Sequence, residues 1–151
     1  MKTILLIEDN KDILENLTEY LVMEGYKILV ANNGQTGIEL ARKFIPDLII
    51  CDVLMSKMDG YEVLHLLLAT ATTYEIPFIF STSMSEKVDR TEALKLGADD
   101  YITKPFEMEV LLKMAKYWIK SGSIRHNSTA IKIEEQFKYV GTPISEQRPF
   151  I

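Results

Sequence analysis

Five polar side chains stand directly after short apolar runs of the sequence. Glu8 and Asp9 follow LLI, Asp52 follows LIIC, Thr82 follows FIFS and Lys104 follows YIT. Three carboxylates held close together repel each other, and a divalent cation removes that conflict; a set of oxygen ligands suits Mg²⁺. With the lysine and the hydroxyl nearby, such a site could capture a phosphoryl group. Asp52 is the best candidate for the nucleophile, because Glu8 and Asp9 are paired as metal ligands would be.

Each of these residues also has an ordinary structural explanation. The acidic turn after the first apolar run could simply cap the next helix, and Asp52 could be a common acid at the end of a strand. Thr82 could bond its own backbone, and Lys104 could be a solvated surface charge. Chance would have to place such residues at four strand ends at once, so their joint position favours a site.

The elements that must position these residues alternate along the chain. Short runs rich in Ile, Leu and Val predict buried strands, and longer segments with apolar residues at helical spacing predict amphipathic helices. Such alternation predicts an α/β fold, a parallel sheet with helices on both faces, whose ligands gather at the carboxyl ends of the strands. The predicted strands are residues 2–7, 26–31, 47–51, 77–80 and 100–103, and the predicted helices are 10–24, 34–44, 60–69, 86–96 and 106–120.

Composition excludes several classes of protein. The 151 residues carry a net charge of −5 and 47% hydrophobic side chains, with Cys51 as the single cysteine. One cysteine excludes an intramolecular disulfide framework and a multi-cysteine zinc site. The acidic balance argues against direct binding of nucleic acid, and no apolar run reaches the roughly 20 residues of a membrane helix. We therefore expect a cytoplasmic domain that contacts neither nucleic acid nor membrane.

Four sequence blocks carry a resemblance to a known family. In order along residues 2–120 they are LLIEDN, LIICDVLMSKMDGYEVL, PFIFSTS and LGADDYITKPF. Together they resemble the receiver domain of two-component response regulators, the CheY-like superfamily. The resemblance implies a flavodoxin-like, doubly wound sheet of five parallel strands in the order 2-1-3-4-5 with five helices.

The resemblance also implies a metal site and a phosphoacceptor. Glu8, Asp9, Asp52 and the backbone carbonyl of Leu54 would bind Mg²⁺. Asp52 would accept a phosphoryl group from a histidine of a sensor kinase or phosphotransfer protein. The chain would then catalyse only its own aspartyl phosphorylation and dephosphorylation, and would not otherwise be an enzyme.

Four further residues take roles from the same resemblance. Thr82 would contact the phosphoryl group and shift with it, and Lys104 would pair with the group. Tyr101 would rotate inward as the aromatic switch. The bond from Lys104 to Pro105 would be cis.

Several positions depart from the commonest family pattern. Glu8 stands where an aspartate is more frequent, and Ser81 stands where an aliphatic residue is commoner. Leu54 and Met84 are apolar at the two variable positions that border the phosphorylation site. Because neither can orient a hydrolytic water, we expect a long-lived phosphoryl bond.

The preferred function is that of a signalling module that is switched by phosphorylation. The switch would change a face formed by the last two strands and the last two helices, and an unknown downstream protein would bind that face. A phosphorelay intermediate is the alternative with the same chemistry. A flavin-binding carrier is disfavoured by the acidic loop after the first strand, and an aspartyl phosphatase by Leu54 where it needs a second aspartate. We expect a monomer or weak homodimer.

We expect no complete output domain in the last part of the chain. A domain over 1–120 would be followed by a tail over 121–151, which begins with a Ser-Gly-Ser linker and is too short for a DNA-binding domain. Ile133, Phe137, Val140 and Ile144 have the spacing of one short amphipathic helix. Either the chain is a stand-alone receiver with a docking tail, or it is a fragment of a longer regulator.

Overall fold

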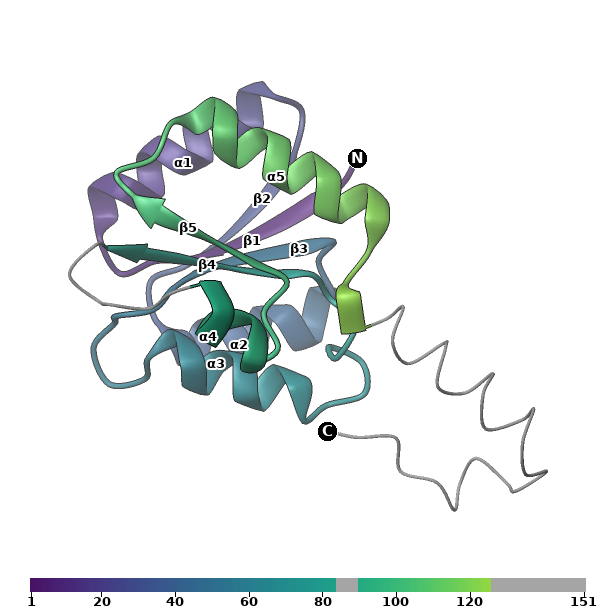
Figure 1. Ribbon diagram of the computed structural model, residues 1–151. Coiled ribbons are helices and arrows are strands. Elements are labelled where there is room, and N and C mark those ends of the chain that lie inside the picture. The colour runs from purple at the N-terminus through teal and green to yellow at the C-terminus, as the bar shows by residue number, and fades with distance from the viewer. Residues whose placement is uncertain (84–89, 126–151) are drawn as a thin grey trace, which may run out of the picture.

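A computed structural model describes residues 1–83 and 90–125. Its centre is a sheet of five parallel strands in the order β2-β1-β3-β4-β5, as predicted. Helices α1 and α5 cover one face and α2, α3 and α4 cover the other (Figure 1). The strands are β1 Thr3–Ile7, β2 Lys27–Ala31, β3 Leu48–Asp52, β4 Phe78–Ser83 and β5 Asp100–Lys104, and the helices are α1 Lys11–Met23, α2 Gly34–Phe44, α3 Gly60–Leu68, α4 Arg90–Lys95 and α5 Met108–Ser121.

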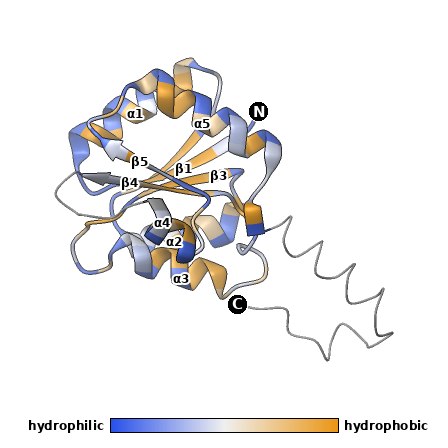
Figure 2. Cartoon of the chain, viewed as in Figure 1, coloured by the Kyte–Doolittle hydropathy of each residue, from blue (hydrophilic) through white to orange (hydrophobic). Residues whose placement is uncertain are grey.

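Alternation along the strands divides the core into two layers. Leu5, Ile7 and Cys51 belong to the cluster beneath α2 and α3, while Ile4 and Leu6 belong to the cluster beneath α1 and α5. Both faces of the central strands are therefore apolar, which explains their continuous hydrophobic runs. In Figure 2 the central strands β1 and β3 are mostly orange, whereas β5 carries blue, and the helices carry blue segments among orange ones.

Strands β3, β4 and β5 extend further toward their carboxyl ends than their apolar residues predict, whereas β1 and β2 end at the predicted residues. β4 does not stop at Phe80 but continues through Ser83, because its polar residues still pair with β5. The ladder joins Ser81 to Ile102, and it ends at Ser83 and Lys104. Backbone pairing continues where side-chain hydrophobicity ends, so the polar residues at this edge are held within the sheet.

Side-chain caps fix the helices that follow the first three strands. Asn10 accepts a hydrogen bond from the Ile13 N–H at the start of α1, and Asn33 caps α2 in the same way. Asp59 accepts from the Glu62 N–H at the start of α3. Each cap satisfies an N–H that the first helical turn leaves unpaired. The loops at the carboxyl edge of the sheet therefore have defined shapes.

The chain beyond α5 packs back on the opposite edge of the sheet. Arg125 is 8% exposed, and its guanidinium lies 3.2 Å from Oδ2 of Asp99. Oδ1 of Asp99 accepts hydrogen bonds from the Ser123 hydroxyl and the Ile124 N–H, and Oδ2 accepts one from the Phe78 N–H. The guanidinium also donates to three backbone carbonyls, those of Tyr74, Ile76 and Gly97.

Some predictions fall outside the described residues. They are Met84, the start of the fourth predicted helix and the amphipathic stripe Ile133, Phe137, Val140 and Ile144. Within the described ranges, none of the helices combines the length and apolar character that crossing a membrane requires.

Candidate functional site

Three carboxylates meet at the carboxyl edge of the sheet. Glu8 and Asp9 follow β1, and Asp52 is the last residue of the neighbouring β3. Each offers one oxygen atom, and the three oxygens lie within 4.8 Å of one another. Glu8 and Asp52 are buried, and Asp9 is exposed. The fold therefore brings these three residues together at the sheet edge where the sequence analysis expects them.

The donor set fits a small, hard cation. All three candidate ligand atoms are carboxylate oxygens, which Mg²⁺ prefers, and together they would supply three of the oxygen ligands around one ion. Asp9 opens to solvent, which leaves room for the waters that Mg²⁺ keeps.

Lys104 crosses the site from β5 and contacts two of the carboxylates. Its Nζ lies 2.6 Å from Oε1 of Glu8 and 3.2 Å from Oδ1 of Asp52. Burial disfavours the ammonium, but the contacts with Glu8 and Asp52 outweigh burial and raise the pKa of Lys104 above its ordinary value of 10.5. The lysine is therefore a fixed cation at neutral pH, beside the group that the sequence analysis selects as nucleophile.

Backbone N–H groups hold two of the carboxylates from their other side. The Asn10 N–H donates to Oε2 of Glu8 over 3.1 Å, so that Glu8 bridges the start of α1 and Lys104. The Ser56 N–H lies 3.4 Å from Oδ2 of Asp9 and joins the loops after β1 and β3. These contacts orient the acids before any ligand binds.

Gly60 allows α3 to begin against the backbone of Asp52. Its N–H donates to the Val53 carbonyl over 2.7 Å. A Cβ atom at this position would lie 2.4 Å from the backbone oxygen of Asp52. Only glycine fits such an approach. The sequence analysis did not single out this residue, although the Asp-Gly pair after the third strand was an available signal.

The two polar residues at the end of β4 have different surroundings. Thr82 is 1% exposed and pairs with Thr103, but among the residues that the structure describes no hydrogen bond joins its hydroxyl to the carboxylates. Its role stays a prediction. Ser81, which the sequence analysis noted only as a departure, is the direct register partner of Asp52 and is buried.

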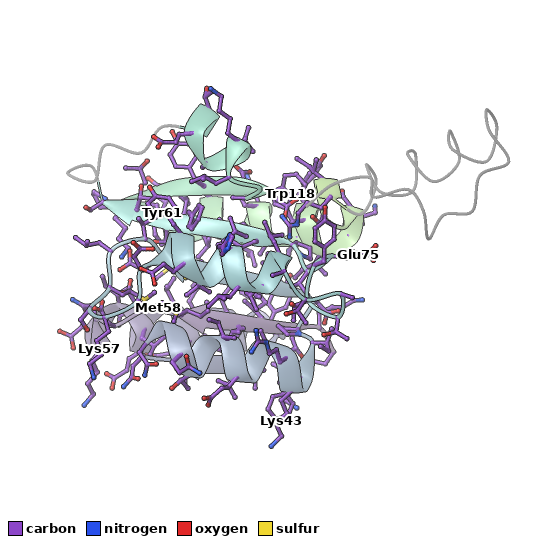
Figure 3. All side chains as sticks on the ribbon, turned by 90° about the horizontal axis from the view of Figure 1, so that it is seen from below. Lys43, Lys57, Met58, Tyr61, Glu75 and Trp118 are labelled. Atoms are coloured by element: carbon purple, nitrogen blue, oxygen red, sulfur yellow. The ribbon has the colours of Figure 1, made fainter. Side chains whose placement is uncertain are left out.

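The remaining predicted residues lie around this group. Tyr101 is half-buried on β5 and packs on the cluster beneath α3. The peptide bond from Lys104 to Pro105 is cis. Leu54 is 66% exposed in the loop after β3. That loop carries Lys57 at the opposite end of the domain from Trp118 (Figure 3).

Cys51 lies beside Asp52 but faces away from the site. Its side chain is buried in the cluster beneath α2 and α3. Burial, reinforced by the negative charges of Asp52 and Glu8, raises the pKa of the thiol well above its ordinary value of 9.0. A neutral, buried thiol is a poor nucleophile, so Cys51 serves as a small core residue.

Comparisons with known proteins agree with this geometry. The family model of the response regulator receiver domain matches residues 4–116. Protein PilH of Pseudomonas aeruginosa is 35% identical over 113 residues, which cover 75% of this chain and 93% of PilH. The transcriptional regulatory protein CpxR of Escherichia coli K12 is 39% identical over 106 residues, 70% of this chain but 44% of CpxR. The chain thus spans less than half of CpxR.

A solved structure with the same fold carries a metal ion. It is the receiver domain of the sensor histidine kinase PA1611 from Pseudomonas aeruginosa, described with a magnesium ion coordinated in the active-site cleft. It superposes with a TM-score of 0.70 at 28% identity and covers 80% of this chain and 98% of its own. With the matched strand order, the acidic cluster and the family match over residues 4–116, this chain belongs to the response regulator receiver domains of two-component systems.

Proposed function

We propose that this domain accepts a phosphoryl group on Asp52 with the help of Mg²⁺. The observation that carries the proposal is the position of Lys104, whose ammonium lies within 3.2 Å of both Glu8 and Asp52. A phosphoryl group carries excess negative charge on its oxygens as it transfers, and a fixed cation next to the nucleophile stabilises that charge. Bound Mg²⁺ would supply the second positive charge, held by Glu8, Asp9 and Asp52.

Each residue of the site has a separate task in this proposal. The carboxylate of Asp52 attacks phosphorus, and the bond from phosphorus to the donor breaks. Lys104 neutralises the phosphoryl oxygens on one side, and the carbonyl of Leu54 would complete the protein ligands of bound Mg²⁺. Thr82 then moves toward the new group, and Tyr101 fills the space that Thr82 leaves.

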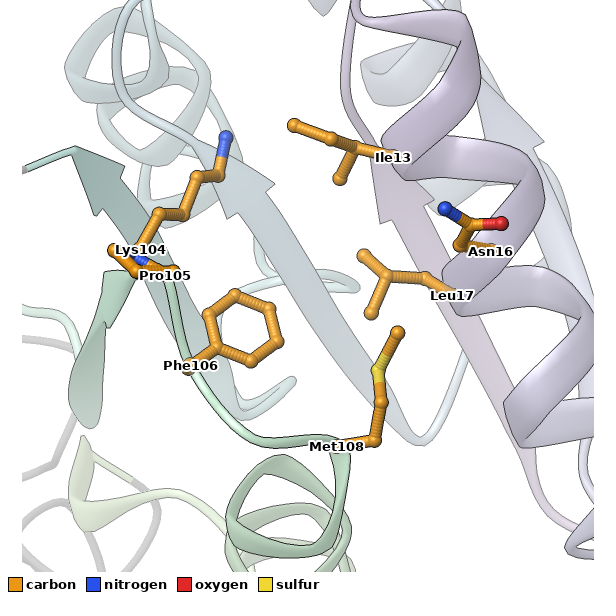
Figure 4. A pocket seen from close by; sticks show the side chains of 7 residues that line it. All are labelled: Ile13, Asn16, Leu17, Lys104, Pro105, Phe106 and Met108. Atoms are coloured by element: carbon orange, nitrogen blue, oxygen red, sulfur yellow. The ribbon is translucent and has the colours of Figure 1, made fainter.

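An apolar pocket next to Lys104 supports a protein as the phosphoryl donor. It has a volume of about 350 Å³ and lies between α1 and the loop after β5 (Figure 4). Its lining is mostly apolar, and it consists of Ile13, Asn16, Leu17, Lys104, Pro105, Phe106 and Met108. A side chain of a sensor kinase or phosphotransfer protein inserted there would bring a neighbouring phosphohistidine to Asp52.

The output of the domain is also a proposal. Movement of Thr82 and Tyr101 would alter the face formed by α4, β5 and α5, which a downstream protein then reads. Differential stabilisation of a few kcal/mol is sufficient to shift such an equilibrium. The domain would then act as a signalling switch and not as a conventional enzyme.

Intact mass spectrometry tests the chemistry directly. Wild type incubated with acetyl phosphate and Mg²⁺ should gain the mass of one phosphoryl group, and EDTA should prevent the gain. Asp52→Asn should gain nothing under the same conditions. A mass gain in Asp52→Asn equal to that of wild type, or no gain in wild type, would contradict the proposal.

A further inference from the structure

A hollow between α3 and the end of α4 exposes apolar side chains that the phosphorylation site does not use. Its volume is about 420 Å³, and its lining consists of Asp59, Tyr61, Glu62, His65, Leu66 and Leu96. Leu66 is 36% exposed and Leu96 is 44% exposed. Single exposed leucines are common on protein surfaces, but exposed apolar side chains gathered in one hollow are typical of a binding surface. We call this hollow the α3–α4 groove.

The described part of the chain ends beside this groove. From α5 the chain passes the edge of the sheet and ends on the side of α3 and α4 (Figure 1). There the guanidinium of Arg125 donates to the carbonyl of Gly97, which directly follows Leu96 of the groove. The contact between Arg125 and the buried Asp99 fixes this position. The chain therefore leaves the domain next to the Leu96 wall of the groove.

The segment that follows has an apolar stripe and can reach the groove. Residues 126–151 lie outside the described part of the chain. The stripe, which we call the tail stripe, consists of Ile133, Phe137, Val140 and Ile144. A short segment with this helical spacing forms a stable helix only when its apolar side packs on another surface. The seven residues 126–132 span up to about 23 Å when extended, whereas α3, with 9 residues, is about 14 Å long.

Two other hollows fit the tail stripe less well. The apolar pocket lined by Lys104 and Phe106 lies at the carboxyl edge of the sheet, and Arg125 lies at the opposite edge. The hollow between the start of α2 and the loop after β3 is lined mostly by polar residues, among them Asn33 and Gln35. The α3–α4 groove combines exposed apolar side chains with a position next to the exit of the chain.

We propose that the tail stripe docks in the α3–α4 groove of the same chain. This inference goes beyond the proposed function and requires neither phosphorylation nor a metal. Because seven residues tether the tail stripe to the domain, its effective concentration at the groove is in the millimolar range, and a weak contact is sufficient. The docked segment covers Leu66 and Leu96. A protein that binds this groove then has to displace the segment first.

Pairs of introduced cysteines measure the docking in the full chain. Leu96→Cys supplies one thiol in the groove. The second comes from Ile133→Cys, on the tail stripe, or from Glu135→Cys, which helical spacing places on the other side. The two tethers differ by two residues, which hardly changes the entropy of loop closure. The thiol of Cys51 is buried and its pKa is raised, so it does not take part.

Each double variant is equilibrated with reduced and oxidised glutathione, and intact mass gives the fraction with an internal disulfide. From this fraction follows the effective concentration of one thiol at the other. It should be at least about tenfold higher for Ile133→Cys than for Glu135→Cys, each combined with Leu96→Cys. Phe137→Asp should abolish this difference, because it places a charge against the apolar groove. Tyr139→Asp, the same change on the other side of the helical spacing, should preserve it.

Three outcomes would overturn the inference. Equal effective concentrations for the two pairs would show that the tail stripe does not face the groove. A disulfide-linked dimer as the main product would place the stripe on a second copy of the chain. Loss of the difference with Tyr139→Asp as well as with Phe137→Asp would assign the effect to added charge. Leu66→Cys in place of Leu96→Cys repeats the comparison from the α3 side of the groove and should give the same order.

Discussion

Replacement of Gly60 by alanine tests whether the start of α3 must touch the backbone of Asp52. The added Cβ would lie 2.4 Å from the Asp52 backbone oxygen and 3.0 Å from Cα of Val53. Ordinary contact begins at 3.4 Å, so the helix start must retreat by about 1 Å. Both neighbours are backbone atoms, one in the last residue of β3 and one in the first residue after it, and neither can rotate away.

The expected cost follows from these contacts. Overpacking of this kind destabilises by about 1–3 kcal/mol, and loss of the hydrogen bond from Gly60 to the Val53 carbonyl adds about 1 kcal/mol. We therefore expect Gly60→Ala to lower the free energy of unfolding by about 3 kcal/mol, which corresponds to a fall in Tm of roughly 10 °C. Because the helix start retreats from Asp52, phosphorylation by acetyl phosphate should also slow.

Urea unfolding followed by fluorescence measures this effect. Trp118 is the single tryptophan, and its indole N–H donates to Asp100 at the far end of β5 from the site, so the probe does not sense the substitution directly. Gly34→Ala is the control. Its Cβ would meet Sδ of Met58 and Cγ2 of Val63, both at 2.9 Å, which are side-chain atoms that can shift. If Gly60→Ala lowers the free energy of unfolding no more than Gly34→Ala does, the reasoning is refuted.

Three further predictions concern charge, pH and metal. Arg125→Met leaves Asp99 buried without its cation and should lower the free energy of unfolding by about 3–5 kcal/mol in urea, whereas Lys113→Met on the surface should change it by less than about 0.5 kcal/mol. Because the buried thiol of Cys51 has a raised pKa, the unfolded chain ionises first as the pH rises above 9.0. The stability advantage of wild type over Cys51→Ala should therefore fall between pH 8 and pH 10, and a constant difference would contradict the burial argument. Mg²⁺ at a hundred times its Kd should stabilise wild type by about 2.7 kcal/mol, reversed by EDTA. Asp9→Asn should need a higher Mg²⁺ concentration for the same rise in Tm, and an identical titration curve would remove Asp9 from the metal site.

The sequence was sufficient for the sheet order through its family resemblance, and for the meeting of Glu8, Asp9 and Asp52 because strand ends converge on one edge of a parallel sheet. It could not predict that Lys104 reaches across β4 and β3 to Glu8, since that contact depends on the length and rotamer of two side chains from distant strands. The register that pairs Ser81 with Asp52 was likewise invisible, because β4 extends beyond its apolar residues.

The contacts of Arg125 determine where the C-terminal boundary of the folded domain lies. The guanidinium holds the carbonyls that precede β4 and β5, and it lies beyond both the end of α5 and the last residue, 116, that the family model matches. A domain boundary drawn at the end of the family match would remove Arg125 and leave the buried carboxylate of Asp99 without its cation. Anyone who transplants this domain, or joins a new effector to it, should place the junction after residue 125.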